Sequence, residues 1–217
     1  MNMITTQSLI AIFNAMGNAI ESEKEQLCVL DGAIGDADHG ITMSIGFRAV
    51  GKALNAVEPG STTPTDVFNT AAKTFLNAVG ASAGPLYATA FMRAGASVKG
   101  TDVLDTAALG CAIEAMAEGI KSRGKAEPGD KTMLDAWLPA AATAREFTDS
   151  ESMVDMITAI ENAANAGALS TINMVAKKGR SAKLGDRTIG HQDAGAASTA
   201  ILISAMASFI RDAQTQT

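Results

Sequence analysis

Aromatic side chains are scarce in this sequence, whose 217 residues include 7 Phe, 1 Trp and 1 Tyr. Alanine is the most frequent residue, and hydrophobic residues make up 47% of the chain. Strands favour aromatic and β-branched side chains, whereas alanine has the highest helix propensity. The composition therefore excludes an all-β fold and predicts closely packed helices around a hydrophobic core.

Cysteine and positive charge are also in short supply. Cys28 and Cys111 are far apart, which excludes a disulfide scaffold or zinc knuckle and fits a reducing compartment. Lys and Arg number 17 against 23 Asp and Glu, and the net charge of −6 argues against nucleic acid and anionic membranes as partners. No apolar run reaches the roughly 18 residues of a membrane span, and no signal-peptide core is present. We therefore expect a cytoplasmic protein.

The familiar nucleotide and metal motifs are missing. The sequence has no P-loop, no G-x-G-x-x-G fingerprint, no H-E-x-x-H and no C-x-x-C. These absences exclude the common nucleotide-binding folds, together with the helix-borne zinc proteases. Any nucleotide or metal chemistry must therefore come from a less common arrangement of residues.

Apolar residues recur at helical spacing in eight successive segments, separated by glycine, proline or polar clusters. No segment has the composition of a linker and no internal repeat is present, so we expect one all-α domain over residues 1–217. The expected helices begin at a Thr5 or Thr6 cap with Leu9, Phe13, Met16 and Ile20 on one face, and continue with Met43–Leu54, Thr65–Ala78, Leu86–Lys99, a helix from an Asp102 cap to Lys121, one from Thr132 through Pro139, one from Met153 to Ala164 or as far as Val175, and Ala196–Ala213.

Four loops hold most of the glycine, charge and histidine of the chain. They span residues 31–40, 80–85, 122–131 and 179–195, and they are the first, third, fifth and seventh connections between the expected helices. In an up-and-down bundle with short connections, alternate loops fall at the same end. The topology therefore predicts that these four loops share one rim.

Three aspartates, Asp31, Asp36 and Asp38, lie within eight residues of the first rim loop, which contains no basic residue. Crowded carboxylates resist ionisation unless a cation neutralises them. Mg²⁺ takes one or two carboxylates per ion and fills its remaining positions with water and phosphate oxygens. The cluster therefore indicates either one or two Mg²⁺ ions that carry a nucleotide or a solvated acidic turn.

Basic residues and small residues gather in the other rim loops. The positive charge could cover a polyphosphate, could dock an acidic partner, or could be merely solvated. Small residues ahead of a helix, as in 80–85 and 129–132, either bind phosphate through backbone N–H groups or only cap the helix. His39 and His191 are either catalysts or hydrogen-bonding residues. The basic residues are Lys121, Arg123, Lys125 and Lys131 in one loop, and Lys177, Lys178, Arg180, Lys183 and Arg187 in another.

Three segments resemble the nucleotide-binding L subunit of dihydroxyacetone kinases. They are residues 34–40 (IGDADHG), 122–133 (SRGKAEPGDKTM) and 189–193 (IGHQD). The resemblance runs over nearly the whole chain. It implies an eight-helix antiparallel up-and-down barrel that holds a nucleotide, ADP or ATP, and two Mg²⁺ ions at one rim.

The resemblance also implies which residues form the site. The metal ligands would be Asp31, Asp36 and Asp38. Two positions depart from the family pattern: Ala83 stands where many members have serine, with Ser82 one residue earlier, and Ala194 replaces a proline. Nucleotide contacts would come from His39, Gly40, Ile41, Thr42, Ser82, Ala83, Gly124, Thr132, Met133, Arg180, Asp193, Ala194 and Gly195.

From the resemblance we expect a phosphotransferase subunit that passes phosphate from Mg-bound nucleotide to dihydroxyacetone, or to a related ketose such as erythrulose, on a separate K subunit. Either ADP stays bound and is recharged by a phosphocarrier of the phosphoenolpyruvate-dependent system, or ATP exchanges as a substrate. Two alternatives stay open: a nucleotide-loaded regulator of a transcription factor, and a plain helical scaffold. The residues do not decide the ketose, the nucleotide route or the oligomeric state.

Overall fold

The computed structural model describes residues 3–147 and 152–215, and helices dominate this part of the chain. A pair of two-residue strands, β1 (Ile4–Thr5) and β2 (Val103–Leu104), forms the only sheet in the described residues. The helices are α1 (Thr6–Ser22), α2 (Lys24–Ile34), α3 (His39–Leu54), α4 (Pro64–Ala78), α5 (Ala83–Ser97), α6 (Thr106–Gly124), α7 (Leu134–Glu146), α8 (Met153–Ser170) and α9 (Ala194–Thr215), with short 3₁₀ turns η1 (Pro59–Ser61), η2 (Thr171–Asn173) and η3 (Ser181–Thr188).

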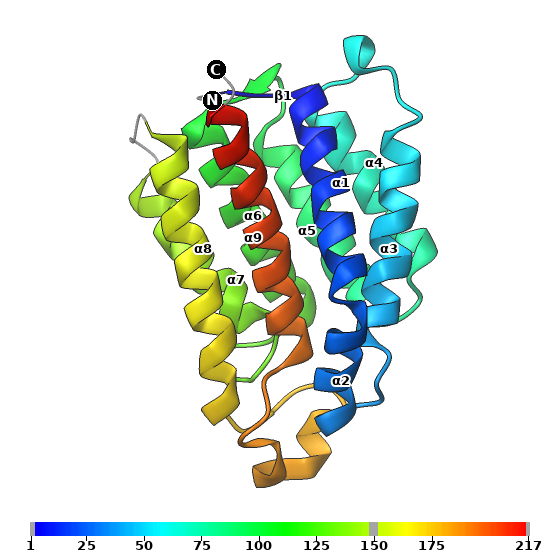
Figure 1. Ribbon diagram of the computed structural model, residues 1–217, viewed down its shortest axis with the longest axis vertical. Coiled ribbons are helices and arrows are strands. Elements are labelled where there is room, and N and C mark those ends of the chain that lie inside the picture. The colour runs from blue at the N-terminus through cyan, green and yellow to red at the C-terminus, as the bar shows by residue number, and fades with distance from the viewer. Residues whose placement is uncertain (1–2, 148–151, 216–217) are drawn as a thin grey trace.

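Eight of these helices close into a barrel. From α3 onward each packs on the next along the chain, α1 packs on α3, and α9 packs back on α1 to complete the ring. Figure 1 shows the helices running up and down, with α2, η3 and the rim loops at the lower end and β1 at the upper end. The expected all-α, eight-helix antiparallel barrel is confirmed. Helix α2 was not expected as a separate element; it continues α1 and packs against α3 and α9.

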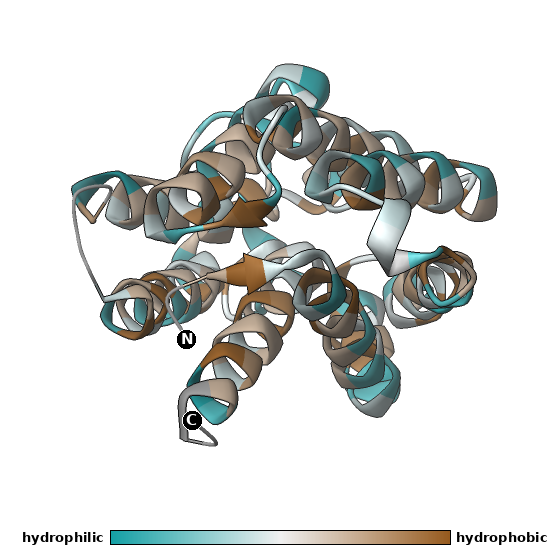
Figure 2. Cartoon of the chain, turned by 90° about the horizontal axis from the view of Figure 1, so that it is seen from above, coloured by the Kyte–Doolittle hydropathy of each residue, from teal (hydrophilic) through white to brown (hydrophobic). Residues whose placement is uncertain are grey.

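The hydrophobic core fills the inside of the ring and draws side chains from α1 to α9. Seen from above, hydrophilic residues lie mostly on the outer sides of the helices (Figure 2). The few aromatic residues are concentrated here: Phe47, Phe75, Tyr87 and Phe91 pack mainly edge to face, with ring centroids 5.4 to 6.4 Å apart. Alanines fill the closer helix contacts, which explains their abundance.

The start of α6 corrects one expectation from the sequence. Asp102 does not cap this helix, because the residues that follow it pair with β1, Ile4 opposite Leu104. The helix begins three residues later, where the side chain of Asp105 accepts a hydrogen bond from the N–H of Ala108 at 2.8 Å. A strand of only two residues carries too little periodicity to show in the sequence.

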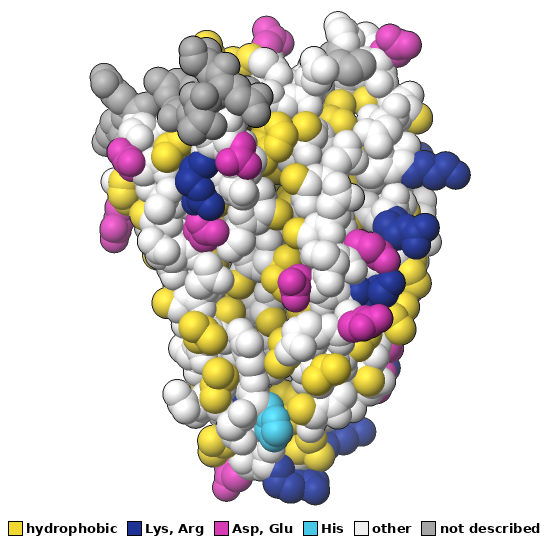
Figure 3. Space-filling view, viewed as in Figure 1, with side chains coloured by type: hydrophobic (Ala, Val, Ile, Leu, Met, Phe, Trp, Pro, Cys, Tyr) yellow, Lys and Arg dark blue, Asp and Glu magenta, His cyan; other side chains and the backbone are white. Residues whose placement is uncertain are grey.

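Helix α9 is long and apolar enough to cross a membrane, although no apolar run of that length was expected from the sequence. Most of its residues are buried in the barrel, between α8 and α1, so its composition is that of a core helix. Its outer side forms the floor of a groove of about 560 Å³, lined by small and apolar residues such as Ala197, Ile201 and Leu169. Figure 3 shows hydrophobic side chains along this face of the molecule.

Candidate functional site

The four rim loops meet in one cleft, as the alternation of up-and-down helices predicts. The cleft has a volume of about 770 Å³ and is lined by the connections between α2 and α3, α4 and α5, α6 and α7, and α8 and α9. Its lining includes residues as far apart in sequence as Asp31, Ser82, Thr132 and Gly195. A volume of this size accommodates a ligand as large as a nucleotide.

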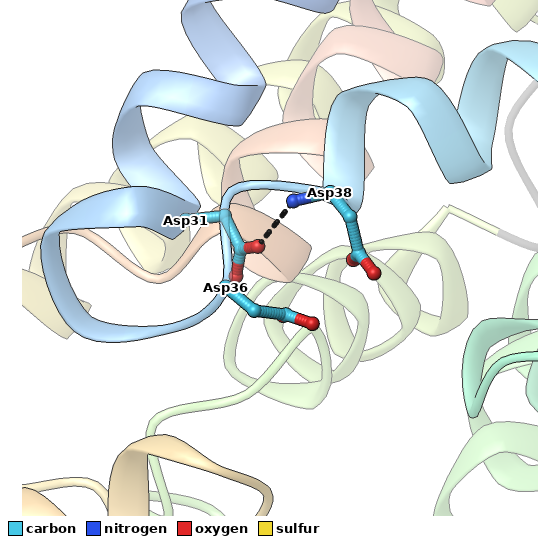
Figure 4. Close-up of side chains that lie close together, drawn as sticks. All are labelled: Asp31, Asp36 and Asp38. Atoms are coloured by element: carbon cyan, nitrogen blue, oxygen red, sulfur yellow. Dashed lines mark hydrogen bonds between the residues drawn. The ribbon is translucent and has the colours of Figure 1, made fainter.

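The three aspartates lie together at this cleft (Figure 4). One carboxylate oxygen of each of Asp31, Asp36 and Asp38 lies within 4.8 Å of the others. Asp31 belongs to the last turn of α2, and the loop turns back so that the backbone N–H of Asp38 donates to its Oδ2 at 3.0 Å. Asp36 and Asp38 are exposed, which leaves their oxygens accessible from the cleft. Three oxygen donors so close together fit a hard divalent cation.

A basic residue reaches this cluster from a distant part of the chain. The guanidinium of Arg180, just before η3, contacts the carboxylate of Asp36. The side chain of Arg180 is 70% exposed and that of Asp36 is 37% exposed, so the ion pair lies in solvent at the mouth of the cleft. The loop of residues 31–40 contains no cation, but the fold brings one to it.

The helices around the barrel differ in how their first turns are satisfied. The four helices that begin at the end opposite the cleft have a side-chain cap that accepts a backbone N–H. At the cleft, α3, α5 and α7 begin without such a bond. The positive ends of these helices therefore favour an anion in the cleft, although in α7 the N–H groups of Leu134 and Asp135 already donate to Thr132. The capped starts are at Thr5, Thr63, Asp105 and Ser152, and the uncapped ones at Asp38, Ser82 and Met133.

His39 joins α3 to α9 directly behind the aspartates. Its Nε2 lies 2.9 Å from the hydroxyl of Ser198, and that hydroxyl donates to the carbonyl of Gly195 at 3.0 Å. A hydroxyl has one hydrogen, so we assign Nε2 of His39 as the donor in the first bond. Burial lowers the pKa of His39, while the nearby carboxylate of Asp31 raises it. His39 is therefore a hydrogen-bonding link between α3 and α9, and its burial favours the neutral form.

Asp193 is the most strongly perturbed acid of the cleft. Its Oδ2 accepts the N–H of Ala196 at 2.8 Å and thereby caps α9. Burial raises the pKa of Asp193 to about 7; the Ala196 N–H and Lys131 lower it, and Asp135 and Asp31 raise it. A buried carboxyl with this pKa changes its charge near neutral pH.

Most residues that the resemblance implies for the nucleotide line this cleft. Gly40 and Ile41 are the exceptions: Gly40 is buried against α2, and Ile41 is 50% exposed. Helical geometry explains why Gly40 and Ile41 do not line the cleft, because His39 and Thr42 share the face of α3 that meets it. The lining residues from that set are His39, Thr42, Ser82, Ala83, Gly124, Thr132, Met133, Arg180, Asp193, Ala194 and Gly195.

The cleft also contains residues outside the set that the resemblance implies. Those in 80–85, Arg123 and Lys178 had been predicted as possible phosphate contacts, whereas the others had no signal beyond their position in or beside the same loops. Residues 80–84 also have the spacing G-x-S-x-G, but they follow helix α4 and not a strand, so they do not form the nucleophile elbow of a hydrolase. The additional lining residues include Gly80, Ala81, Pro85, Leu86, Ile120, Arg123, Ala126, Lys178, Gly179 and Ser181.

Three roles were open for the basic residues in 121–131, and two of these residues bind groups of this chain instead. Lys131 is only 2% exposed, and its ammonium group bonds to backbone carbonyls. Lys121 lies on α6 and pairs with Glu127, at 3.3 Å. Arg123 does line the cleft, and the basic side chains of the other loop lie at the lower end of the molecule, where η3 is (Figures 1 and 3).

Gly40 has a structural role that a substitution can test. A Cβ at this position would overlap the carbonyl of Lys24 and press on the sulfur of Cys28, so α2 packs on α3 only with glycine here. Gly40→Ala is expected to lower the free energy of unfolding by about 1–3 kcal/mol, measured by urea titration followed by circular dichroism. Gly60→Ala is the control, because nothing lies within 4 Å of a Cβ there. Equal urea midpoints for the two variants would show that α2 can shift away from α3 without a loss of folding free energy.

The rim of this all-helical barrel combines a carboxylate cluster that fits a cation with helix starts that favour an anion. These two features together are those of a domain that binds a nucleotide with a metal ion, and comparison with known proteins gives the same class. Residues 33–208 match the DAK2 domain family. The chain is 40% identical over 193 residues to the ADP-binding subunit DhaL of PEP-dependent dihydroxyacetone kinase 2 from Listeria innocua, covering 89% of each chain. It is 38% identical over 192 residues to the corresponding Escherichia coli subunit, covering 88% of this chain and 90% of that one. The chain belongs to the DAK2 domain family, among the L subunits of dihydroxyacetone kinases.

A solved structure shows the same fold. The dihydroxyacetone kinase from C. freundii in complex with AMP-PNP and Mg²⁺ superposes with a TM-score of 0.71 at 24% identity. The match covers 92% of this chain and 33% of that one, so the chain spans about a third of that kinase. The barrel therefore has the fold of one part of that longer chain.

Proposed function

We propose that this chain is the ADP-binding subunit of a dihydroxyacetone kinase and transfers a phosphoryl group from Mg-bound nucleotide to a small ketose held on a separate K subunit. The observation that carries the proposal is the cluster of Asp31, Asp36 and Asp38 beside a cleft into which three uncapped helices point. The relatives named as ADP-binding DhaL subunits support it. The core shared by all the helices supports a single nucleotide-binding domain over residues 1–217.

The three aspartates are proposed to hold Mg²⁺, as two ions. Their carboxylates fit the preference of this ion for hard oxygen ligands, and it would neutralise charge on the transferred phosphoryl group. The first residues of α3, including Gly40 and Ile41, would contribute only backbone groups. The nucleotide is proposed to contact His39, Gly40, Ile41, Thr42, Ser82, Ala83, Gly124, Thr132, Met133, Arg180, Asp193, Ala194 and Gly195.

The chain's own groups supply positioning and electrostatic stabilisation. The starts of α3 and α5 with their backbone N–H groups, the positive end of α7 and the guanidinium of Arg180 would stabilise phosphate charge in the cleft. Such preorganised donors typically contribute about 10²-fold or more each in rate. Phosphoryl transfer depends mainly on this positioning, which explains how a site without a nucleophile can act.

The partners follow from the same proposal. The ketose, dihydroxyacetone or a similar small ketose, is bound by the K subunit, and a phosphocarrier of the phosphoenolpyruvate-dependent system recharges the retained ADP. The names of both relatives, which specify a PEP-dependent kinase, favour this route over exchange of ATP. The free thiols Cys28 and Cys111 accord with a cytoplasmic location.

The proposed activity is tested by mixing the purified chain with a K subunit and the phosphocarrier system. Dihydroxyacetone phosphate should form from phosphoenolpyruvate only when this chain is present, and calorimetry should detect Mg·ADP binding. A chain that binds Mg·ADP but supports no turnover, with either phosphoenolpyruvate or ATP as the phosphoryl donor, would instead be a nucleotide-loaded regulator.

The nucleotide route has its own test with radiolabelled ADP. We expect label loaded onto the chain to survive gel filtration, because a cofactor that is recharged in place need not dissociate. Rapid exchange of the label into excess unlabelled nucleotide would contradict the carrier route and favour ATP as a substrate.

A further inference from the structure

The strongest unassigned feature is a buried lysine at the base of the longest rim loop. We propose that Lys131 is a positioning residue: its ammonium group ties together the two ends of the loop 171–193, so that Arg180 and Asp193 are held at the nucleotide cleft. This inference rests on the proposed function, because it concerns the same nucleotide site.

The contacts of Lys131 show how the loop is closed. Its side chain is almost completely buried, and Nζ donates to the carbonyl oxygens of Thr171 and Met174, where the chain leaves α8. It also donates to the carbonyls of Thr188 at 2.9 Å and His191, where the chain returns toward α9. One group therefore joins both ends of the loop to the start of α7.

Only a cation fits these contacts well. An ammonium group has three hydrogens to share among four carbonyl acceptors, whereas a neutral amine has two. Burial lowers the pKa of Lys131, while the carboxylate of Asp193 raises it, and the carbonyl oxygens favour the charged form. A neutral side chain here would leave buried carbonyls without a partner.

The backbone of Lys131 has an unfavourable conformation that the inward position of its side chain requires. Its φ is +61°, a left-handed conformation that favours glycine or asparagine over other residues. The neighbouring turn is held by the carboxylate of Asp135, which accepts the N–H groups of Gly129 and Thr132 at 2.6 and 2.8 Å. The turn directs the side chain of Lys131 inward, between the rim loops. The free-energy cost of its left-handed backbone is therefore linked to the bonds that Nζ makes with the loop carbonyls.

The loop beyond this base carries the groups that reach the cleft. Lys178, Gly179, Arg180 and Ser181 line it, and Arg180 contacts Asp36. At the far end of the loop, the N–H of Asp193 donates to Thr171 Oγ1 at 3.0 Å. Backbone groups also cross this base, as in the bond from Gly190 N–H to the Ile172 carbonyl at 2.8 Å. Loss of the Lys131 contacts is therefore expected to loosen Arg180 and Asp193 at the cleft, while the barrel helices keep their packing.

The direct test replaces Lys131 with methionine, which keeps most of the length of the side chain and removes its charged end. For Lys131→Met we expect the Kd for Mg·ADP to rise about 10- to 100-fold, while far-UV circular dichroism stays that of the barrel. Tryptic cleavage in the loop, after Lys177, Lys178, Arg180, Lys183 or Arg187, should become at least about tenfold faster. Lys73→Met is the control for the loss of a lysine, because Lys73 is exposed on α4 and lies outside the loop and the cleft. Wild-type affinity and protection in Lys131→Met would overturn the proposal.

A double-mutant cycle separates positioning from a general structural effect. Arg180→Ala should weaken Mg·ADP binding about tenfold in the wild-type chain and much less in Lys131→Met, because the arginine is no longer held at the cleft. Equal effects in the two backgrounds would show that Lys131 does not act through Arg180.

A measurement on the wild-type chain covers the case in which Lys131→Met does not fold. With ¹⁵N-labelled lysine, the tie predicts one ammonium signal protected from exchange with water, which disappears in Lys131→Arg. A spectrum without a protected ammonium would refute the tie. A wild-type chain that shows this signal but binds no Mg·ADP would contradict the proposed function and leave the loop closure standing.

Discussion

Replacing Asp36 with asparagine is expected to weaken Mg·ADP binding by about a hundredfold or more. The substitution keeps the size of the side chain and removes one of three carboxylates whose oxygens lie within 4.8 Å of one another. A neutral amide oxygen is a much weaker ligand for Mg²⁺ than a carboxylate at this position. Calorimetric titration with ADP in the presence of Mg²⁺ measures the effect.

The fold should be almost unaffected by this change. The ion pair between Asp36 and Arg180 is exposed, and such pairs contribute about 0–1 kcal/mol. The helical circular dichroism and unfolding midpoint of Asp36→Asn are therefore expected to match those of the wild type. Asp102→Asn is the control for a lost carboxylate, because Asp102 is exposed, immediately precedes β2 and does not line the cleft. Unchanged Mg·ADP affinity in Asp36→Asn would remove this residue from the metal site.

The contribution of Asp193 to the stability of the chain without ligand should fall as the pH rises from about 4 to about 7. Its pKa is about 7 in the folded chain, mainly through burial, against 3.8 for an unperturbed carboxyl. Between these values the folded state keeps a proton that the unfolded state has lost, so raising the pH favours unfolding. One pKa unit corresponds to about 1.4 kcal/mol, and Asp193 should account for a loss of about 4 kcal/mol.

Asp193→Asn tests this assignment. Asparagine caps helices as well as aspartate does, so the bond to the Ala196 N–H can persist without a buried charge. The variant should be the more stable chain at pH 8 and equal to the wild type near pH 4, in urea titrations at each pH. Asp66 is a control of opposite sign: hydrogen bonds from Thr63 lower its pKa, so its contribution is lost as the pH falls. Parallel pH curves for wild type and Asp193→Asn would contradict the assignment.

Much of the fold was predictable because it depends on local patterns. Helical periodicity located all eight barrel helices, and the alternation of loops placed the four rim loops together. The boundaries were less accurate. Helix α3 begins at His39 and not near Met43, because glycine and polar residues fill its first turn at the cleft. The pairing of β1 with β2 makes α6 begin later than the sequence predicted, and this pairing joins residues about 100 positions apart.

The candidate site was predictable where it depends on one short segment. Asp31, Asp36 and Asp38 lie in a single loop, so their crowding is visible in the sequence. The contact of Arg180 with Asp36 joins residues far apart in the chain, and no local pattern indicates it. Lys131 was misread for the same reason: its four acceptors come from a loop 40 to 60 residues away, and in the sequence it is one basic residue among several.

The central claim is that the rim aspartates bind Mg²⁺ and that the metal holds the nucleotide in the cleft. Calorimetric titration of ADP into the wild-type chain, once with Mg²⁺ and once with a chelator, tests it most directly. The account predicts tight binding at one site with Mg²⁺ and a loss of affinity of at least about a hundredfold without it. Equal affinity under the two conditions, or no binding in either, would contradict the account.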